Sequence, residues 1–216
     1  MSKGYFITGT GTNVGKTYVS ALLVKHFHKI NESTAYYKAA LSGLDIAISD
    51  ALYVQEISEI KDEAIKVSYT FDTAVSPHLA SQIENKSIDF IKIKKDFYDL
   101  QSEYQTVIVE GSGGIICPIA ETSECIMLED IINMTQYPLI IVTDSGLGGI
   151  NAAVLTSYYA KTKGMNIYGF IMNNYDSTNI LHVDNKKMIE KLSGIPIIGY
   201  VANNGNEILG FGENSI

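Results

Sequence analysis

The stretch that decides the fold is Tyr5-Phe-Ile-Thr-Gly-Thr-Gly-Thr-Asn-Val-Gly-Lys-Thr17. Its first residues are mostly apolar and favour a strand, and glycines follow at positions 9, 11 and 15. From Tyr18 to Ile30 apolar residues recur at helical spacing. A strand that runs through a glycine loop into a helix is the setting of a phosphate-binding loop, because the loop amides and the helix N-terminus face an anion together.

The end of this loop supplies two side chains suited to nucleotide chemistry. Lys16 can reach the β- and γ-phosphates, and the Thr17 hydroxyl can bind Mg²⁺. The spacing is unusual, because five residues separate Gly9 from Gly15 where the common motif has four, with Thr10 in the place of the first glycine. The alternative is a glycine-rich turn with a chance Gly-Lys-Thr, which the flanking strand and helix disfavour.

Composition restricts the class of protein. The 216 residues are 46% hydrophobic, which fits a single α/β domain over residues 1–216. The net charge is −8 and no Lys/Arg run exceeds two, so no nucleic-acid partner is expected. A strand begins directly after the N-terminus and no apolar run reaches the roughly 18 residues of a membrane span, which predicts a cytoplasmic protein. Cys117 and Cys125 are expected to be reduced residues in or near the core.

A second informative stretch is Thr106-Val-Ile-Val-Glu-Gly-Ser-Gly-Gly114. Val107–Val109 are typical of a parallel strand buried on both faces, and the strand ends in Glu110. Ligand groups of α/β proteins collect at such strand ends. Glu110 is therefore a candidate Mg²⁺ ligand, directly or through water, and the alternative is a chance acidic strand end.

The rest of the chain alternates strand and helix patterns. Further strands are expected at 34–40, 66–71, 138–143, 166–173 and 196–200, and helices at 48–57, 86–104, 127–134, 150–163 and 184–192. The alternation predicts a P-loop NTPase-type α/β fold, a doubly wound, mainly parallel sheet with helices on both faces. Two interpretations stay open from the residues alone. Asp50 is either a helix cap or a Mg²⁺ ligand, and the loop 145–151 is either an anion-binding helix start or a tight connection.

Together these stretches resemble the dethiobiotin synthetases, the ATP-dependent carboxylases of biotin synthesis. The resemblance covers about residues 1–200 and includes the five-residue spacing of the first loop. The other matching motifs are, in order, Tyr37–Gly43, Ser49–Ala51, Ser76–His78, Val109–Gly114 and Leu147–Asn151. The chain departs from the family at Gly11, Asn13 and Ala39, and its tail after Gly199 is shorter than the family segment that encloses the nucleotide base.

The resemblance implies closure of a cyclic urea on 7,8-diaminononanoate, with CO₂ and ATP as the other substrates. One amine takes up CO₂ as a carbamate, and the carbamate oxygen attacks the γ-phosphate to give a carbamic–phosphoric anhydride and ADP. The second amine then closes the ring and expels phosphate. The resemblance also implies Mg²⁺ as a cofactor, and a homodimer whose substrate site lies near the subunit interface.

Residue roles are implied by the same motifs. The catalytic residues are Lys16, Lys38, Thr12 and Ser42. The nucleotide-binding residues are Gly11, Thr12, Asn13, Val14, Gly15, Lys16, Thr17, Tyr18, Glu110, Gly111, Gly113, Asn173 and Asn174. The substrate-binding residues are Thr12, Lys38, Ser42, Leu147, Gly149, Ile150 and Asn151, and the metal ligands are Thr17, Asp50 and Glu110.

Three other functions share parts of this pattern. A regulatory P-loop ATPase of the partition or cell-division type carries a second lysine early in its loop, where this chain has Gly11. A cobyrinate-type synthase carries a glutaminase half, for which no sequence is present. A module that only binds nucleotide requires neither Lys38 nor Glu110. The synthetase is therefore the preferred hypothesis, and the regulatory ATPase is its alternative.

Overall fold

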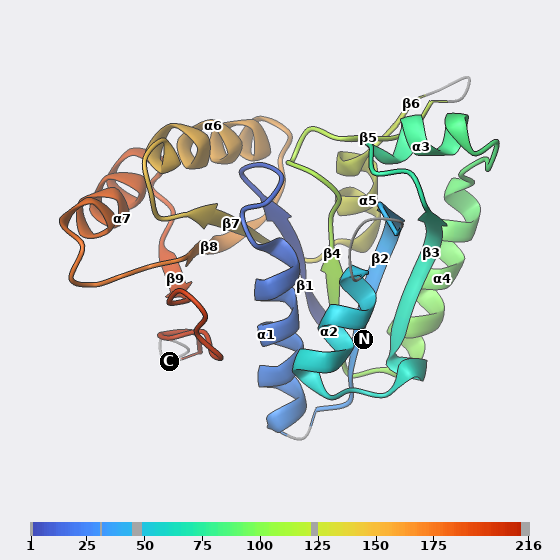
Figure 1. Cartoon of the computed structure of the whole chain (residues 1–216), viewed down its shortest axis with the longest axis horizontal. Coiled ribbons are helices and arrows are strands. Elements are labelled where there is room, and N and C mark those ends of the chain that lie inside the picture. Colours follow the sequence, from blue (N-terminus) through green and yellow to red (C-terminus); the bar gives the residue numbers. More distant parts are fainter. Residues whose placement is uncertain (1, 31, 45–48, 122–124, 213–216) are drawn as a thin grey trace.

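The computed structural model describes residues 2–30, 32–44, 49–121 and 125–212 (Figure 1). Its described part contains a parallel sheet of seven strands in the order β3-β2-β4-β1-β7-β8-β9. The strands of this sheet are β1 (Lys3–Gly9), β2 (Thr34–Ser42), β3 (Ile65–Phe71), β4 (Thr106–Glu110), β7 (Leu139–Asp144), β8 (Ile167–Asn173) and β9 (Ile197–Tyr200). Every strand pair in it is parallel, which confirms the predicted sheet.

Helices cover both faces of the sheet (Figure 1). They are α1 (Lys16–Lys29), α2 (Asp50–Ser58), α3 (Pro77–Ile83), α4 (Phe90–Glu103), α5 (Leu128–Thr135), α6 (Gly149–Thr162) and α7 (Ile180–Ser193). Helices α1 and α2 pack against each other in front of the central strands, and α4 lies behind β2, β3 and β4. No helix in the described ranges is long and apolar enough to cross a bilayer. The doubly wound arrangement expected from the alternating pattern is therefore confirmed.

The central strands form because their residues bury apolar side chains on both faces. All five residues of β4 are buried, and β2 is buried from Thr34 to Leu41. β-Branched residues dominate β4, and β2 carries alanines and two tyrosines among its buried residues, so both strands pack on a surface covered from both sides. Burial on both sides leaves the ends of the strands as the places where polar side chains reach a solvent-accessible site.

Some predicted boundaries were wrong. Helix α4 begins at Phe90 after its cap Asp89, four residues later than expected, and α7 begins at Ile180 after its cap Asn179, four residues earlier. A short antiparallel hairpin of β5 (Pro118–Glu121) and β6 (Cys125–Met127) was not predicted, nor was the 3₁₀ turn η1 (Asp62–Ala64). Because Cys125 lies on this hairpin it is exposed, whereas Cys117 is buried as expected, and both are free thiols.

The register of the sheet brings the informative residues together. Lys38 on β2 lies directly opposite Glu110 on β4, and Glu110 in turn lies opposite Ile7 on β1, two residues before the glycine loop. The carboxyl ends of these parallel strands meet at one edge of the sheet, where α/β proteins bind ligands. The fold thus places the loop, the acid and the second lysine at one edge.

Candidate active site

The glycine loop has the conformation that its sequence requires. It joins β1 to α1, and Gly15, the residue before α1, has a φ of 91°, which side chains other than glycine rarely adopt. A Cβ at Gly15 would also lie 2.0 Å from the Asn173 side-chain nitrogen. That nitrogen donates a 3.1 Å hydrogen bond to the carbonyl of Val14, so Asn173 at the end of β8 supports the loop.

The loop presents unpaired backbone donors at a helix N-terminus. No side chain caps α1, and no acceptor among the described residues bonds the N–H groups of residues 11–18. Such groups and the helix dipole together attract an anion. The side chain of Lys16 folds back over the loop, and its ammonium donates a 2.9 Å hydrogen bond to the carbonyl of Gly11. The loop therefore combines a row of N–H donors with a cation.

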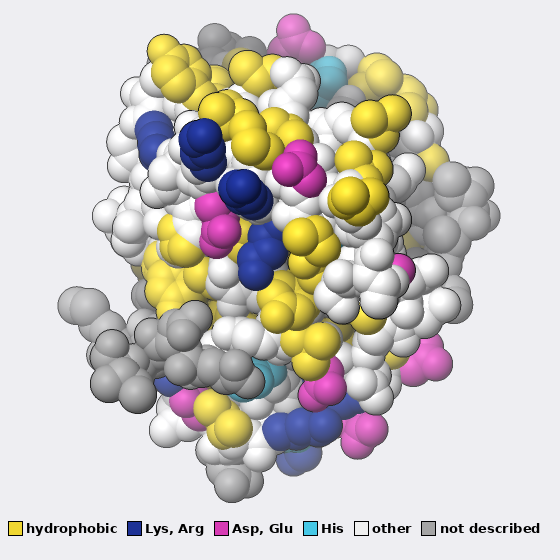
Figure 2. Space-filling view, turned by 90° about the vertical axis from the view of Figure 1, so that its left-hand side faces the viewer, with side chains coloured by type: hydrophobic (Ala, Val, Ile, Leu, Met, Phe, Trp, Pro, Cys, Tyr) yellow, Lys and Arg dark blue, Asp and Glu magenta, His cyan; other side chains and the backbone are white. Residues whose placement is uncertain are grey.

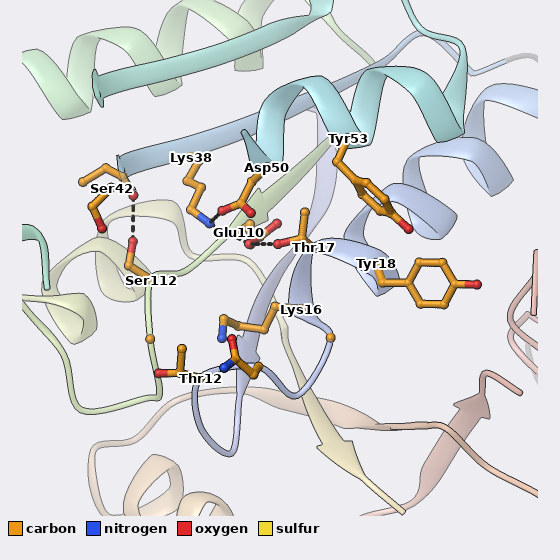
Figure 3. A pocket seen from close by; sticks show the side chains of 14 residues that line it. Thr12, Lys16, Thr17, Tyr18, Lys38, Ser42, Asp50, Tyr53, Glu110 and Ser112 are labelled. Carbon is orange, nitrogen blue, oxygen red and sulfur yellow. Dashed lines mark hydrogen bonds and ion pairs between the residues drawn. The ribbon is translucent and has the colours of Figure 1, made fainter. Parts of the chain in front are cut away.

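A charged cluster lies across from Lys16 (Figure 3). The Lys38 ammonium contacts Glu110 Oε1 at 2.7 Å and also pairs with Asp50 Oδ2. Thr17 donates to the same Glu110 Oε1 at 2.9 Å. Lys38 and Glu110 are 5% and 2% exposed, so this ion pair is shielded from water. Lys38 is consequently a fixed positive charge in the site.

Burial and these partners shift the pKa values of the cluster. Burial alone lowers the pKa of Lys38, but Glu110 and Asp50 outweigh burial and raise it, so the ammonium stays protonated. Burial lowers the pKa of Lys16, which Glu110 only partly offsets. Burial, and then the charge of Glu110, raise the pKa of Tyr36 well above its ordinary value, and the Tyr36 hydroxyl donates to Glu110 Oε2 at 2.9 Å.

The start of α2 shows whether Asp50 is the helix cap, which was one of its two interpretations. Ser49 caps this helix, since its hydroxyl accepts a hydrogen bond from the Leu52 N–H at 3.2 Å. Asp50 is therefore not the cap, and its carboxylate pairs with Lys38 instead. The expected helix start at Ile48 lies outside the described residues.

A cavity of about 570 Å³ surrounds the cluster. Its lining residues come from the loop, the start of α1, the ends of β2 and β4, the turn after β4, and α2. They are Thr12, Asn13, Gly15, Lys16, Thr17, Tyr18, Lys38, Ala40, Ser42, Asp50, Tyr53, Glu110, Ser112 and Gly113. Figure 3 shows Ser42 and Ser112 at one end and Tyr18 and Tyr53 at the other. The Ser42 hydroxyl donates to the Val75 carbonyl at 2.6 Å. The cavity thus has two polar ends with the loop between them.

Some predicted site residues lie outside this cavity. Gly11, Val14, Gly111, Asn173 and Asn174 do not line it. Gly111 bonds through its N–H to the Ile7 carbonyl at 2.9 Å, and a Cβ there would lie 3.1 Å from both Leu128 and Phe6. The predicted substrate residues at the start of α6 do not line it either; these are Leu147, Gly149, Ile150 and Asn151, of which Leu147 is 94% exposed.

Three residues of the site were not singled out from the sequence. Tyr53 follows Asp50 by three residues on α2, which places both on one helix face. Ser112 stands between the glycines after Glu110, and its hydroxyl donates to the Ala40 carbonyl at 2.8 Å. Tyr36 precedes Lys38 by two residues on β2 and so shares its face of the sheet. Helical and strand periodicity from Asp50 and Lys38 are the signals that point to Tyr53 and Tyr36.

The donor atoms suit Mg²⁺. Thr17, Asp50 and Glu110 offer only oxygen, the ligand that this ion prefers, and Mg²⁺ is commonly bound by one or two carboxylates together with phosphates. The described residues contain no group of three or more His, Cys, Asp or Glu side chains that could hold a metal alone. A site completed by a nucleotide's phosphates therefore fits the residues that are present.

Comparison with known proteins agrees with this site. A sequence profile described as an AAA domain matches residues 3–206. The chain is 45% identical over 215 residues to an ATP-dependent dethiobiotin synthetase BioD of Clostridium botulinum, covering 96% of this chain and 94% of that protein. It is 48% identical over 204 residues to the protein of the same name from Brachyspira hyodysenteriae, covering 93% and 92% of the two chains.

Solved structures show the same fold at much lower identity. A ParA family ATPase from Chlorobium tepidum aligns with a TM-score of 0.62 at 14% identity, covering 94% of this chain and 86% of that chain. This likeness establishes a P-loop NTPase architecture, not an activity. Identity of 45–48% over more than nine-tenths of each chain is far more specific. The chain therefore belongs to the ATP-dependent dethiobiotin synthetase family.

Proposed function

We propose that the chain forms dethiobiotin from 7,8-diaminononanoate, CO₂ and ATP. The observation that carries this proposal is the buried Lys38, held by Glu110 and Asp50 across the cavity from Lys16. An anionic carbamate must approach an anionic γ-phosphate in this reaction, so two opposed cations lower the electrostatic barrier. A protein that only binds nucleotide has no need of the second cation. The regulatory ATPase alternative rests on fold likeness alone.

Each residue has a proposed task in the reaction. The N–H groups of the loop and Lys16 bind the triphosphate, while Lys38 holds the carbamate. Thr12 and Ser42 line the part of the cavity where the carbamate or the free amine would lie. The carbamate oxygen bonds to the γ-phosphorus as the bond to ADP breaks. The second amine then bonds to the carbamate carbon, phosphate leaves, and the nitrogen loses its proton to phosphate or water.

Mg²⁺ is proposed as the cofactor, held by Thr17, Asp50 and Glu110, and it neutralises phosphate charge when bound. Glu110 Oε1 already accepts hydrogen bonds from Thr17 and Lys38. This arrangement keeps the carboxylate at the end of β4 pointed toward the cavity. In this proposal Thr17, Asp50 and Glu110 bind the metal ion next to the phosphates, and Lys38, which contacts Glu110, places the carbamate beside them.

The nucleotide base is proposed to lie toward the C-terminal tail. Tyr200 pairs with Leu209, and the Tyr18 hydroxyl donates to the Gly205 carbonyl, so the tail folds back to α1. The tail lines one side of a second cavity of about 390 Å³. Tyr18 and Tyr53 line both this cavity and the main one, and Asn174 also lines the second cavity. Asn173 does not line it, although its Oδ1 is buried without a hydrogen-bond partner in the described part of the chain.

A homodimer is proposed to complete the substrate site. Asn151, Leu155 and Tyr158 recur at helical spacing along one exposed side of α6, and Leu147 lies in the loop just before this helix. Leu147, Leu155 and Tyr158 are 59–94% exposed. Figure 2, which views the molecule from the side of α6 and α7, shows hydrophobic side chains gathered on its upper half. These exposed apolar side chains adjoin the predicted substrate residues. We propose that they contact a second copy of the chain and complete the substrate site of that copy.

Replacing Leu155 with glutamate should convert the dimer to a monomer, because a charge at an apolar contact would have to be desolvated. The 59% exposed side chain lies on the proposed contact side of α6. Light scattering after size-exclusion chromatography measures the mass. Ile91→Glu is the matched control, since Ile91 is 76% exposed on α4 and should leave the dimer intact. A Leu155→Glu protein that remains dimeric contradicts this interface.

The chain is also proposed to work as one α/β domain in the cytoplasm, where nucleoside triphosphate and bicarbonate are available. Its function is tested by adding the diamine to protein, ATP, Mg²⁺ and bicarbonate. Phosphate release should rise strongly when the diamine is added. A rate of ATP hydrolysis that is the same with and without the diamine would favour the regulatory ATPase alternative instead.

A further inference from the structure

The Glu110 carboxylate accepts hydrogen bonds from three side chains, and one of these partners lies outside the cavity. Its Oε1 accepts from Thr17 at 2.9 Å and from Lys38 at 2.7 Å. Its Oε2 accepts from the Tyr36 hydroxyl at 2.9 Å. Thr17, Lys38 and Glu110 line the cavity, whereas Tyr36 does not line it and is fully buried. Tyr36 therefore touches Glu110 from behind the site.

The sheet register explains this contact. Lys38 on β2 lies opposite Glu110 on β4, and Tyr36 lies opposite Ile108. Since strand side chains alternate between faces, Tyr36 and Lys38 point to the face that carries Glu110. Tyr36 is the diagonal neighbour of Glu110, a distance that a long aromatic side chain spans. The Tyr36 hydroxyl therefore bonds to Glu110 Oε2, and Lys38 bonds to Glu110 Oε1.

The hydrogen bond restricts how the carboxylate can turn. The last side-chain torsion of glutamate is broad, so an unrestrained carboxylate rotates freely. A bond from a phenol to an ionised carboxylate is among the stronger kinds, and this one lies in the core. With Oε2 fixed behind, Oε1 is directed toward Thr17 and Lys38. The orientation of the acid is thus set by a residue that never meets the ligand.

We propose that Tyr36 is a positioning residue, whose hydroxyl orients Glu110 toward the metal ion of the nucleotide and toward Lys38. The inference rests on the proposed function, because the metal enters with the nucleotide. Outer partners of metal ligands commonly change metal affinity by 10–100-fold when removed. Tyr36→Phe deletes only the hydroxyl and keeps the ring in the core, so the fold should be retained.

The neighbouring tyrosine supplies the matched control. Tyr37 is also fully buried, but it points to the other face of the sheet. Its hydroxyl bonds to Ser68 Oγ at 2.8 Å and donates to the Ile93 carbonyl at 3.0 Å, away from the site. Tyr37→Phe therefore removes one buried hydroxyl as Tyr36→Phe does. A purely structural role predicts similar behaviour of the two variants.

The test is Mn²⁺ binding by electron paramagnetic resonance in the presence of a non-hydrolysable ATP analogue, with thermal unfolding measured in parallel. Both variants should lose a few degrees of Tm. Tyr36→Phe should weaken Mn²⁺ binding about tenfold or more, and Tyr37→Phe should match the wild type. Equal Mn²⁺ affinities in all three proteins overturn the role of Tyr36 alone. A wild type without nucleotide-dependent Mn²⁺ binding overturns the proposed function as well.

Discussion

Replacing Lys38 with alanine should reduce turnover by about 10²–10³-fold, the usual effect of removing one donor that stabilises charge in a transition state. Lys38 is 5% exposed, and its ammonium lies 2.7 Å from Glu110, across the cavity from Lys16. No other described lysine lines the cavity apart from Lys16, so no cation replaces it. Diamine-dependent phosphate release measures the loss.

The same substitution should also destabilise the fold. Without Lys38 the buried carboxylate of Glu110 keeps hydrogen bonds from Thr17 and Tyr36 but loses its contacting cation. Removing one partner of a buried pair costs about 3 kcal/mol or more, which lowers Tm on the order of 10 °C in a chain of this size. The matched control is Lys95→Ala, which breaks an exposed pair with Asp99 on α4 and should change neither quantity. Near-wild-type turnover of Lys38→Ala would show that its proposed role is wrong.

Replacing Lys16 with alanine should cause a comparable loss of turnover but little loss of stability. Lys16 bonds only to the Gly11 carbonyl in the described structure, and it lies at the N-terminus of α1, where the phosphates are proposed to bind. Its removal takes away the charge that bridges the β- and γ-phosphates, for an expected loss of about 10²–10³-fold in turnover.

The small effect on stability follows from the surroundings of Lys16. Burial lowers its pKa, Glu110 only partly offsets this, and Lys38 adds an unfavourable charge, so the folded protein gains little from this ammonium. One hydrogen bond of about 1 kcal/mol corresponds to a Tm change of roughly 3 °C. Lys29→Ala, an exposed substitution at the other end of α1, is the control for both measurements. A Lys16→Ala protein that turns over normally, or that melts as early as Lys38→Ala, contradicts this account.

The sequence predicted the parts of the site that depend on local pattern. The loop before Lys16 and the acid after the apolar run of β4 stand out because glycine and an ionised residue interrupt strongly hydrophobic strands. Their convergence followed from the rule that parallel strands end at one edge of a sheet. Family resemblance assigned a catalytic role to Lys38 and favoured the metal-ligand interpretation of Asp50, and the structure pairs both in the same cluster.

What the sequence did not predict depends on tertiary contacts. Periodicity from Lys38 places Tyr36 on the Lys38 face of β2, but its partnership with Glu110 also requires the register of β2 on β4, which the sequence does not give. The hairpin after Cys117 was missed because its strands are short and lack alternation. Helix α7 was assigned too late a start because its first turn is exposed and its Asn179 cap was not recognised.

The most direct measurement of the central claim uses ¹⁴C-bicarbonate with 7,8-diaminononanoate, ATP and Mg²⁺. The account predicts that label enters dethiobiotin, with one ADP and one phosphate formed per labelled product. Lys38→Ala should reduce the rate of labelling by about 10²–10³-fold, and Lys95→Ala should leave it unchanged. ADP formation without labelled dethiobiotin, at the same rate with and without the diamine, would contradict the proposed synthetase activity.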